Sequence, residues 1–203
     1  RFRRLGGRPM TVTSYAQNFE DVLLWRALGY VPQGRYLDIG AQDPENDSVS
    51  LAFYEQGWRG IHVEPTATYA QKIRQHRADE TVIEAAVASS GGPIRFFEIA
   101  ETGLSTGVGG IAEQHQREGF ANHETLVPTV RLSGLLDQAD LFHWMKIDVE
   151  GMEGDVLASW DDHPARPWIV IVEATLPNSQ EESDGLWRHE LEGALEHAPV
   201  VII

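Results

Sequence analysis

The chain has 203 residues, of which 42% are hydrophobic and 23% charged, an ordinary composition for one soluble globular domain. Its formal net charge of −15 argues against a nucleic-acid partner, which would require a basic face. The absence of cysteine excludes disulfides, thiolate metal sites and cysteine nucleophiles, and no apolar run is long enough to span a bilayer.

Residues 1–10 are basic and lack the apolar core of a secretory signal. We expect them to form a disordered lead-in to one domain that spans residues 11–203. The cytoplasm is then the default compartment.

The first periodic segment, 14–28, carries apolar residues at the spacing of a helix. Ser14 is the candidate N-cap of this helix, and Gly29 is the residue at which we expect it to stop. On pattern alone, Gln17 and Asp21 lie on its solvated face.

The rest of the chain alternates strands with helices. A buried strand at 36–39 runs into a tight turn at Gly40, and further strands are expected at 58–65, 81–88, 94–99, 142–151 (including its terminal turn), 168–174 and 200–203. Helices are expected at 46–57, 66–77, around 135–136, at 152–160 and at 186–197. This alternation predicts an α/β fold with a doubly wound, mostly parallel sheet.

The periodicity weakens between residues 101 and 129, where several glycines precede a polar stretch. A long insert of this kind inside a compact domain is usually functional or mobile, so we expect a lid over a site. Its two histidines, His115 and His123, are interpreted as solvated loop residues, although either could serve as the base. His62 and His143 are interpreted as structural.

Four predicted strands end in carboxylates. Because the carboxyl ends of parallel strands meet at one edge of a sheet, these side chains should lie together. A single acid there can simply cap the next helix, but several need a cation or many hydrogen-bond donors. The acids are Asp38, Glu64, Asp148 with Glu150, and Glu173.

The turn after the first strand limits which ligand this edge can bind. A dinucleotide requires a Gly-x-Gly-x-x-Gly turn, whereas residues 40–45 lack the second and third glycines and place Asp43 and Glu45 near the phosphate positions. Asp38 and Glu64 have about the separation expected between a turn motif and a ribose-binding acid. A ligand with a ribose, a positive centre and no phosphate fits, and S-adenosylmethionine is such a ligand.

Six segments along the chain carry a recognisable set of motifs: Tyr15–Asp21, Leu37–Ala41, Gly57–Gly60, Val63–Pro65, Lys146–Gly151 with Glu153, and Val172–Ala174. Together they resemble the FkbM-type S-adenosylmethionine-dependent methyltransferases, although Ser133 stands where such proteins often have Asp. The resemblance implies a Rossmann-like class I methyltransferase domain that methylates a hydroxyl group, often on a sugar, glycan or polyketide-type small molecule.

For such a cofactor, Asp38 and Gly40 would hold the methionine end, with a helix N-terminus near Asn46 facing its carboxylate. Glu64 would bind the ribose. Ala86 and Val87 would line the adenine, although they could equally be plain core. The expected cofactor-binding set is Gln17, Asp38, Gly40, Ala41, Glu64, Pro65, Ala86 and Val87.

The expected catalytic residues are Asp148, Glu150 and Glu173. Asp148 could orient the acceptor hydroxyl, act as the base, or ligate a divalent metal with the other two. A metal is possible but not expected, because no histidine pair supports the site. Ser105, Thr106 and Asn178 are the expected acceptor-binding residues.

Two other classes of function stay open at this point. One is a nucleotide-cofactor oxidoreductase built on the same sheet, which the missing glycines after Gly40 disfavour. The other is a non-catalytic domain that keeps the methyltransferase fold inside a larger glycan-assembly protein.

Overall fold

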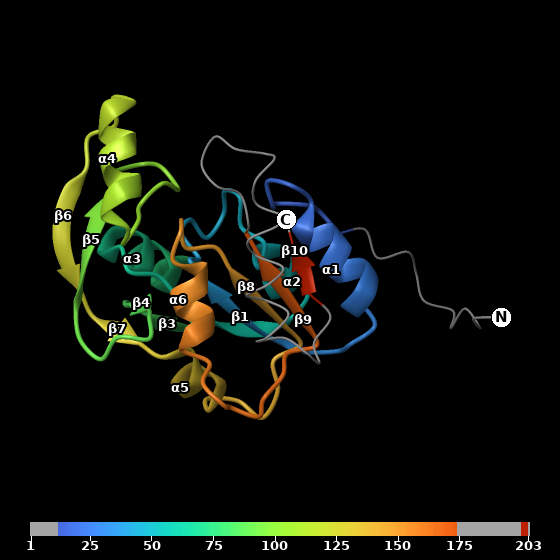
Figure 1. The fold of residues 1–203 in the computed structure, drawn as a ribbon. Coiled ribbons are helices and arrows are strands. Elements are labelled where there is room, and N and C mark those ends of the chain that lie inside the picture. The colour runs from blue at the N-terminus through green and yellow to red at the C-terminus, as the bar shows by residue number, and fades with distance from the viewer. Residues whose placement is uncertain (1–11, 174–199, 203) are drawn as a thin grey trace.

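The computed structural model describes residues 12–173 and 200–202. Within these ranges, parallel strands form a central six-stranded sheet in the order β10-β9-β8-β1-β2-β3 (Figure 1). The winding reverses between β1 and β8, which is where ligands bind in open α/β sheets. The strands are β1 (Arg35–Ile39), β2 (Arg59–Val63), β3 (Thr81–Ile83), β8 (Trp144–Ile147), β9 (Ile169–Val172) and β10 (Val200–Ile202).

Strand β1 shows how the sheet separates two hydrophobic cores. Leu37 and Ile39 belong to a cluster that includes residues of α5 (Leu132–Leu136) and α6 (Glu153–Ala158). Tyr36 belongs to a second cluster with residues of α1 (Glu20–Leu28) and α2 (Leu51–Glu55). Because successive side chains point to opposite faces of a strand, both faces of the sheet are covered.

Helix α3 (Ala67–His76) connects β2 to β3 and buries Ala70 and Ile73. A smaller unit follows β3. In it, β4 (Ala86–Val87) pairs in parallel with β7 (Thr129–Val130), and β5 (Ile94–Glu98) pairs antiparallel with β6 (His123–Val127). Figure 1 shows β5, β6 and α4 (Gly109–Arg117) grouped at one end of the molecule, away from α1.

The predicted doubly wound sheet is confirmed, but the first helix begins later than predicted. It starts at Glu20 because the Asp21 carboxylate accepts hydrogen bonds from Ser14 Oγ (2.8 Å) and Tyr15 N (2.7 Å), which hold the preceding segment in turns. Asp21 is therefore buried, and its placement on a solvated face was wrong.

The helix expected at 46–57 is also shorter, since only α2 is helical. The residues before it wrap around the buried guanidinium of Arg77, which donates to Pro44 O (2.7 Å) and Ser48 Oγ (3.2 Å). The helix that follows Asn46 begins only at Leu51, contrary to the expectation that its N-terminus would lie near Asn46 and face the cofactor.

The strand expected at 81–88 consists of two strands, β3 in the central sheet and β4 in the smaller unit. The segment 101–129 contains α4 and β6, and its role as a lid stays a prediction. The expected lead-in at 1–10 and the expected helix at 186–197 lie outside the described residues. Among the described helices, none has the length and apolar character that crossing a membrane requires.

Candidate active site

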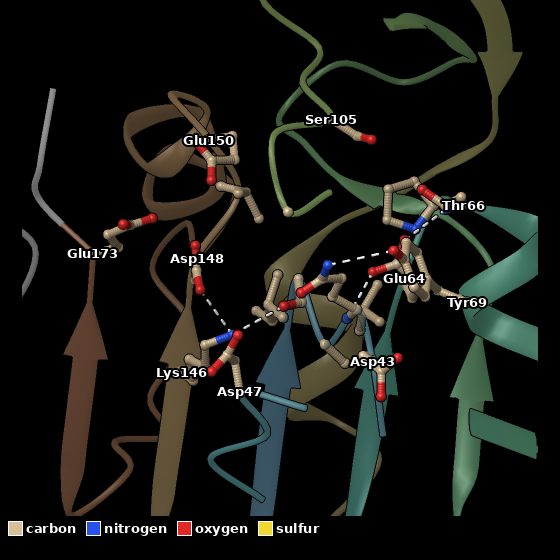
Figure 2. A pocket seen from close by; sticks show the side chains of 18 of the residues that line it. Asp43, Asp47, Glu64, Thr66, Tyr69, Ser105, Lys146, Asp148, Glu150 and Glu173 are labelled. Carbon is tan, nitrogen blue, oxygen red and sulfur yellow. Dashed lines mark hydrogen bonds and ion pairs between the residues drawn. The ribbon is translucent and has the colours of Figure 1, made fainter. Parts of the chain in front are cut away.

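A cavity of about 530 Å³ lies at the carboxyl ends of β1, β2 and β8, where the winding of the sheet reverses. Its volume is typical of a small-molecule site. Figure 2 shows Glu64 above β2, Asp148 above β8 and Glu173 above β9, with Ser105 on the opposite side of the cavity. The acids were predicted to gather at one sheet edge, and the structure brings these three together.

Gly40 is the residue that lets the β1 and β8 ends meet. Its φ of +75° lies in the left-handed region, and a Cβ built on it would lie 1.7 Å from Asp148 O. Its backbone N–H donates to Val63 O (2.9 Å). Only glycine fits this position, because the backbones of two strand ends approach each other directly there.

Glu64 is held by the backbone of two turns. Its carboxylate accepts hydrogen bonds from Gln42 N (2.9 Å) and Thr66 N (2.7 Å), and the residue is 4% exposed (Figure 2). Burial raises the pKa of Glu64, while the two backbone donors act in the opposite direction. The Thr66 side chain also bonds this carboxylate. A carboxylate has about four acceptor positions, so Glu64 can still accept a bond from a ligand hydroxyl.

Asp38 lies beneath the cavity floor rather than among the lining residues. Its carboxylate is 3.8 Å from Lys146 Nζ and 3.6 Å from His62 Nδ1. Burial would raise the pKa of Asp38, but Lys146 and His62 outweigh it and hold the pKa below its usual range. Asp38 was expected beside the methionine end of a cofactor, but its side chain does not line the cavity. Its charge is instead paired with Lys146 inside the sheet.

Asp148, Glu150 and Glu173 form the acidic side of the cavity, with carboxylate oxygens within 4.8 Å of one another. The pKa of Asp148 is lowered overall. Burial alone would raise it, but the charge of Lys146 and a hydrogen bond with Glu173 outweigh the effect of burial. Burial, with the charges of Asp148 and Glu153, raises the pKa of Glu150 to about 7. The ammonium of Lys146 supplies positive charge to this group, and the three carboxylates are also close enough together to hold a divalent cation.

The loop that carries Glu150 is fixed from two directions. Glu153 accepts hydrogen bonds from Val149 N (3.1 Å) and Gly151 N (3.2 Å), and Thr106 Oγ1 donates to Glu150 O (2.7 Å). Glu150 itself has a φ of +51°, an unfavourable value for a residue with a side chain. This strain is held in place by the surrounding bonds.

Most other predicted site residues line the same cavity: Gln17, Gly40, Ala41, Pro65, Ala86, Val87 and Ser105. Thr106 does not line it, because its side chain is fully buried against the Glu150 backbone. Asn178 lies outside the described residues.

The histidine interpretations have mixed outcomes. His115 is buried on α4, so its interpretation as a solvated residue was wrong. His62 is buried as predicted, and His143 Nδ1 accepts from Arg35 N (3.0 Å) at the opposite end of β1, which fits a structural role.

Lys146 was missed by the sequence reasoning. It lines the cavity, and its ammonium lies 2.9 Å from Asp148 Oδ2 and 3.0 Å from Gly40 O. A signal was present, because a lysine inside an otherwise apolar buried strand requires a partner of opposite charge.

The fold and the cavity define a Rossmann-like α/β domain with a cavity at its switch point. The family described as Methyltransferase FkbM domain matches residues 38–197. The chain belongs to the FkbM methyltransferase family.

Among solved structures, the chain is similar to the crystal structure of methyltransferase FkbM from Methylobacillus flagellatus KT. The sequence identity is 18% and the TM-score is 0.40, and the match covers 68% of this chain. The chain spans 32% of the length of that protein. The comparison with curated proteins gave no match.

Proposed function

We propose that this domain uses S-adenosylmethionine to methylate a hydroxyl group of a small molecule, with sugars, glycans and polyketide-type compounds as the acceptor class. The observation that carries the proposal is the position of Glu64. It lies at the end of β2, borders the cavity beside the Gly40 turn and keeps acceptor capacity for a ribose diol. Family membership supports the same chemistry.

The cavity suits a nucleoside without phosphates. Ala86, Val87 and Phe96 give it an apolar wall against which adenine would pack. The first N–H groups of the turn, on Gly40 and Ala41, both donate to Val63 O, and the next helix does not begin until α2. The turn after β1 therefore offers neither a glycine-rich cradle nor a helix N-terminus to a pyrophosphate, which disfavours a dinucleotide.

The proposed cofactor supplies a methyl group already activated on a sulfonium, so the protein mainly has to hold the acceptor oxygen in line. We assign Asp148 to orient the acceptor hydroxyl and Glu150 to take its proton. A base is most effective when its pKa is near the working pH, and the pKa of Glu150 is raised to about 7 by burial and by neighbouring acids. Glu173 supports Asp148 through their hydrogen bond.

The charge of the cavity narrows the acceptor class. Of the lining residues that the structure describes, eight are acids, and Lys146 is the only lysine or arginine. A phosphorylated or carboxylated acceptor would be repelled from this surface, whereas a neutral or amine-bearing acceptor would not. We therefore expect a polyhydroxylated acceptor without negative charge.

Isothermal titration calorimetry with S-adenosylhomocysteine tests the cofactor assignment. We expect saturable binding at one site per chain, and NAD should neither bind nor raise the melting temperature. Binding of NAD without binding of S-adenosylhomocysteine would overturn the proposal in favour of an oxidoreductase.

Transfer of a labelled methyl group from S-adenosylmethionine tests the activity. The panel pairs neutral sugars and hydroxylated polyketides with their phosphorylated or carboxylated counterparts. We expect incorporation only into the uncharged members. Cofactor binding without incorporation into any member would instead favour a non-catalytic domain.

A further inference from the structure

Lys146 occupies an unusual position on the central strand β8. Its neighbours Trp144, Met145 and Ile147 are completely buried, and the Lys146 side chain is only 11% exposed. A buried ammonium is unfavourable unless it is paired and hydrogen-bonded. Its position in the strand therefore requires specific partners.

The partners belong to the two strand ends that meet at the cavity. Lys146 Nζ lies 2.9 Å from Asp148 Oδ2 on the β8 side and donates to Gly40 O (3.0 Å) on the β1 side, as the dashed lines in Figure 2 show. Asp38 Oδ1 is 3.8 Å away, beneath both. One ammonium with three donors thus joins the turn below the proposed cofactor to the carboxylate beside the proposed acceptor.

We propose that Lys146 is a positioning residue for methyl transfer, whose ammonium fixes the Asp148 carboxylate at a set distance from the Gly40 turn. This inference rests on the proposed function. Because Gly40 and Asp148 also touch through their backbones, a small shift of either turn would change the alignment of the two proposed reactants.

The charges around Lys146 explain why a neutral residue at this position would not hold the Asp148 carboxylate in the same way. Besides Asp148 and Asp38, the acids Glu150 and Glu173 act on the same region, and Glu20 of α1 lines the cavity from the side of the first helix. Burial would lower the pKa of Lys146, but Asp148 and Asp38 outweigh it and raise the pKa above its usual value. Without the ammonium, Asp148 would lose the cation that lowers its pKa and would hold a proton more tightly.

The test compares Lys146→Gln with Lys146→Arg. Glutamine can still donate hydrogen bonds but has no charge, whereas arginine keeps the charge, so the pair separates electrostatic positioning from simple filling of space. The side-chain carboxyl of Asp148 is followed by ¹³C NMR across pH, and S-adenosylhomocysteine binding is followed by calorimetry. Lys72→Gln is the matched control, since Lys72 pairs with Asp43 beside the same cavity but does not touch Asp148.

In Lys146→Gln we expect the Asp148 carboxyl to titrate about 1 to 3 pH units higher than in the wild type. We also expect S-adenosylhomocysteine to bind about tenfold more weakly, because the charged bond to Gly40 O is lost. Lys146→Arg should restore the Asp148 titration, and Lys72→Gln should leave it unchanged.

A folded Lys146→Gln variant with wild-type Asp148 titration would overturn the inference and reduce Lys146 to a packing residue. If Lys146→Gln does not fold, Lys146→Arg decides, because an altered Asp148 titration despite the retained charge would also contradict it. Failure of the wild type to bind S-adenosylhomocysteine would instead defeat the proposed function, while the titration would still report whether Lys146 controls Asp148.

Discussion

The acidic side chains on the two sides of the cavity are held in place by different kinds of interaction. On the β1–β2 side, Glu64 accepts from two backbone N–H groups, and Asp43 accepts from the backbone of Glu45 (2.9 Å) and Asn46 (3.0 Å). On the β8–β9 side, Asp148, Glu150 and Glu173 face mainly one another and Lys146. The carboxylates on the first side are anchored by backbone donors, although Asp43 also pairs with Lys72, whereas those on the second side are held mainly by charge.

This difference fits the proposed separation of cofactor binding from catalysis. An acid fixed by backbone donors has a defined orientation, which suits recognition of a diol. Acids that are crowded together compete for protons, so one of them has a pKa near neutrality, which suits proton transfer. We therefore assign cofactor binding to the β1–β2 side and catalysis to the β8–β9 side.

The largest effect on stability is expected from a substitution at the point where the two sides of the cavity meet, which is the contact between Gly40 and Asp148. In Gly40→Ala, the new Cβ would overlap Asp148 O in a left-handed conformation, so we expect a loss of about 3 to 5 kcal/mol in the free energy of unfolding. Urea denaturation measures the loss. Gly57→Ala is the control, because Gly57 has a φ of +87° but no atom within 4 Å of its Cβ position, and it should lose only about 1 kcal/mol. Equal losses in the two variants would show that the contact between the strand ends is unimportant.

Glu64→Gln tests the binding side alone. The amide cannot accept at both ends, so it opposes one of the backbone donors and loses the charged bonds to a ribose diol. We expect the dissociation constant for S-adenosylhomocysteine to rise about 100-fold in calorimetry. Glu84→Gln, at a half-exposed ion pair with Arg74, should bind like the wild type. Wild-type affinity in Glu64→Gln would remove the ribose assignment.

Glu150→Gln tests the catalytic side through pH. The pKa of Glu150 rises from its ordinary value of 4.5 to about 7 on folding, so between these pH values the folded chain binds more protons than the unfolded chain. The stability of the wild type relative to Glu150→Gln should therefore fall as the pH rises from about 4.5 to 7, and change little above that. Melting temperatures recorded across this range measure the effect.

Glu124→Gln provides a comparison for that profile. Arg95 holds the pKa of Glu124 below its ordinary value, so its contribution is lost only below about pH 4.5. Between pH 4.5 and 7 this variant should parallel the wild type. A wild-type profile that parallels Glu150→Gln throughout would mean that Glu150 is not poised for proton transfer.

The sequence was informative about the sheet for a simple physical reason. Segments such as 168–174 are almost continuously apolar, as strands buried on both faces must be, and glycines mark where they turn. The gathering of Glu64 and Asp148 at one edge followed from parallel strands alone. The ends of helices were predicted wrongly where a contact with a residue far along the chain determines them. For example, the buried Arg77 guanidinium holds the residues before α2 in a non-helical turn.

The roles of Asp38 and Lys146 could not be predicted in this way, because they depend on the register between neighbouring strands of the sheet. The two residues are direct partners across β1 and β8, which no local pattern reveals. Asp38 therefore looked like a ligand-binding acid, although its charge is matched within the sheet. The split between β3 and β4 likewise depends on pairing with β7, which lies far along the chain.

Thr106→Val gives the smallest expected effect and tests how the segment after β5 supports the catalytic side. Thr106 Oγ1 donates to Glu150 O (2.7 Å) and accepts from Val108 N (3.0 Å), and valine of the same shape leaves both unpaired. We expect a loss of about 1 to 2 kcal/mol in urea denaturation. S-adenosylhomocysteine should also bind a few-fold more weakly, because the neighbouring residues 102–105 line the cavity.

Thr129→Val removes a hydroxyl whose single proton can be donated to Ser90 O (3.2 Å) or Gly92 O (2.9 Å), in a residue that is not among those lining the cavity. It should lose a similar amount of stability without a change in affinity, because its partners do not support the β8–α6 loop. If the two variants lost affinity equally, the effect would reflect general loosening. A loss confined to Thr106→Val would instead show that a segment from the smaller unit keeps the strained Glu150 backbone in its place beside Asp148.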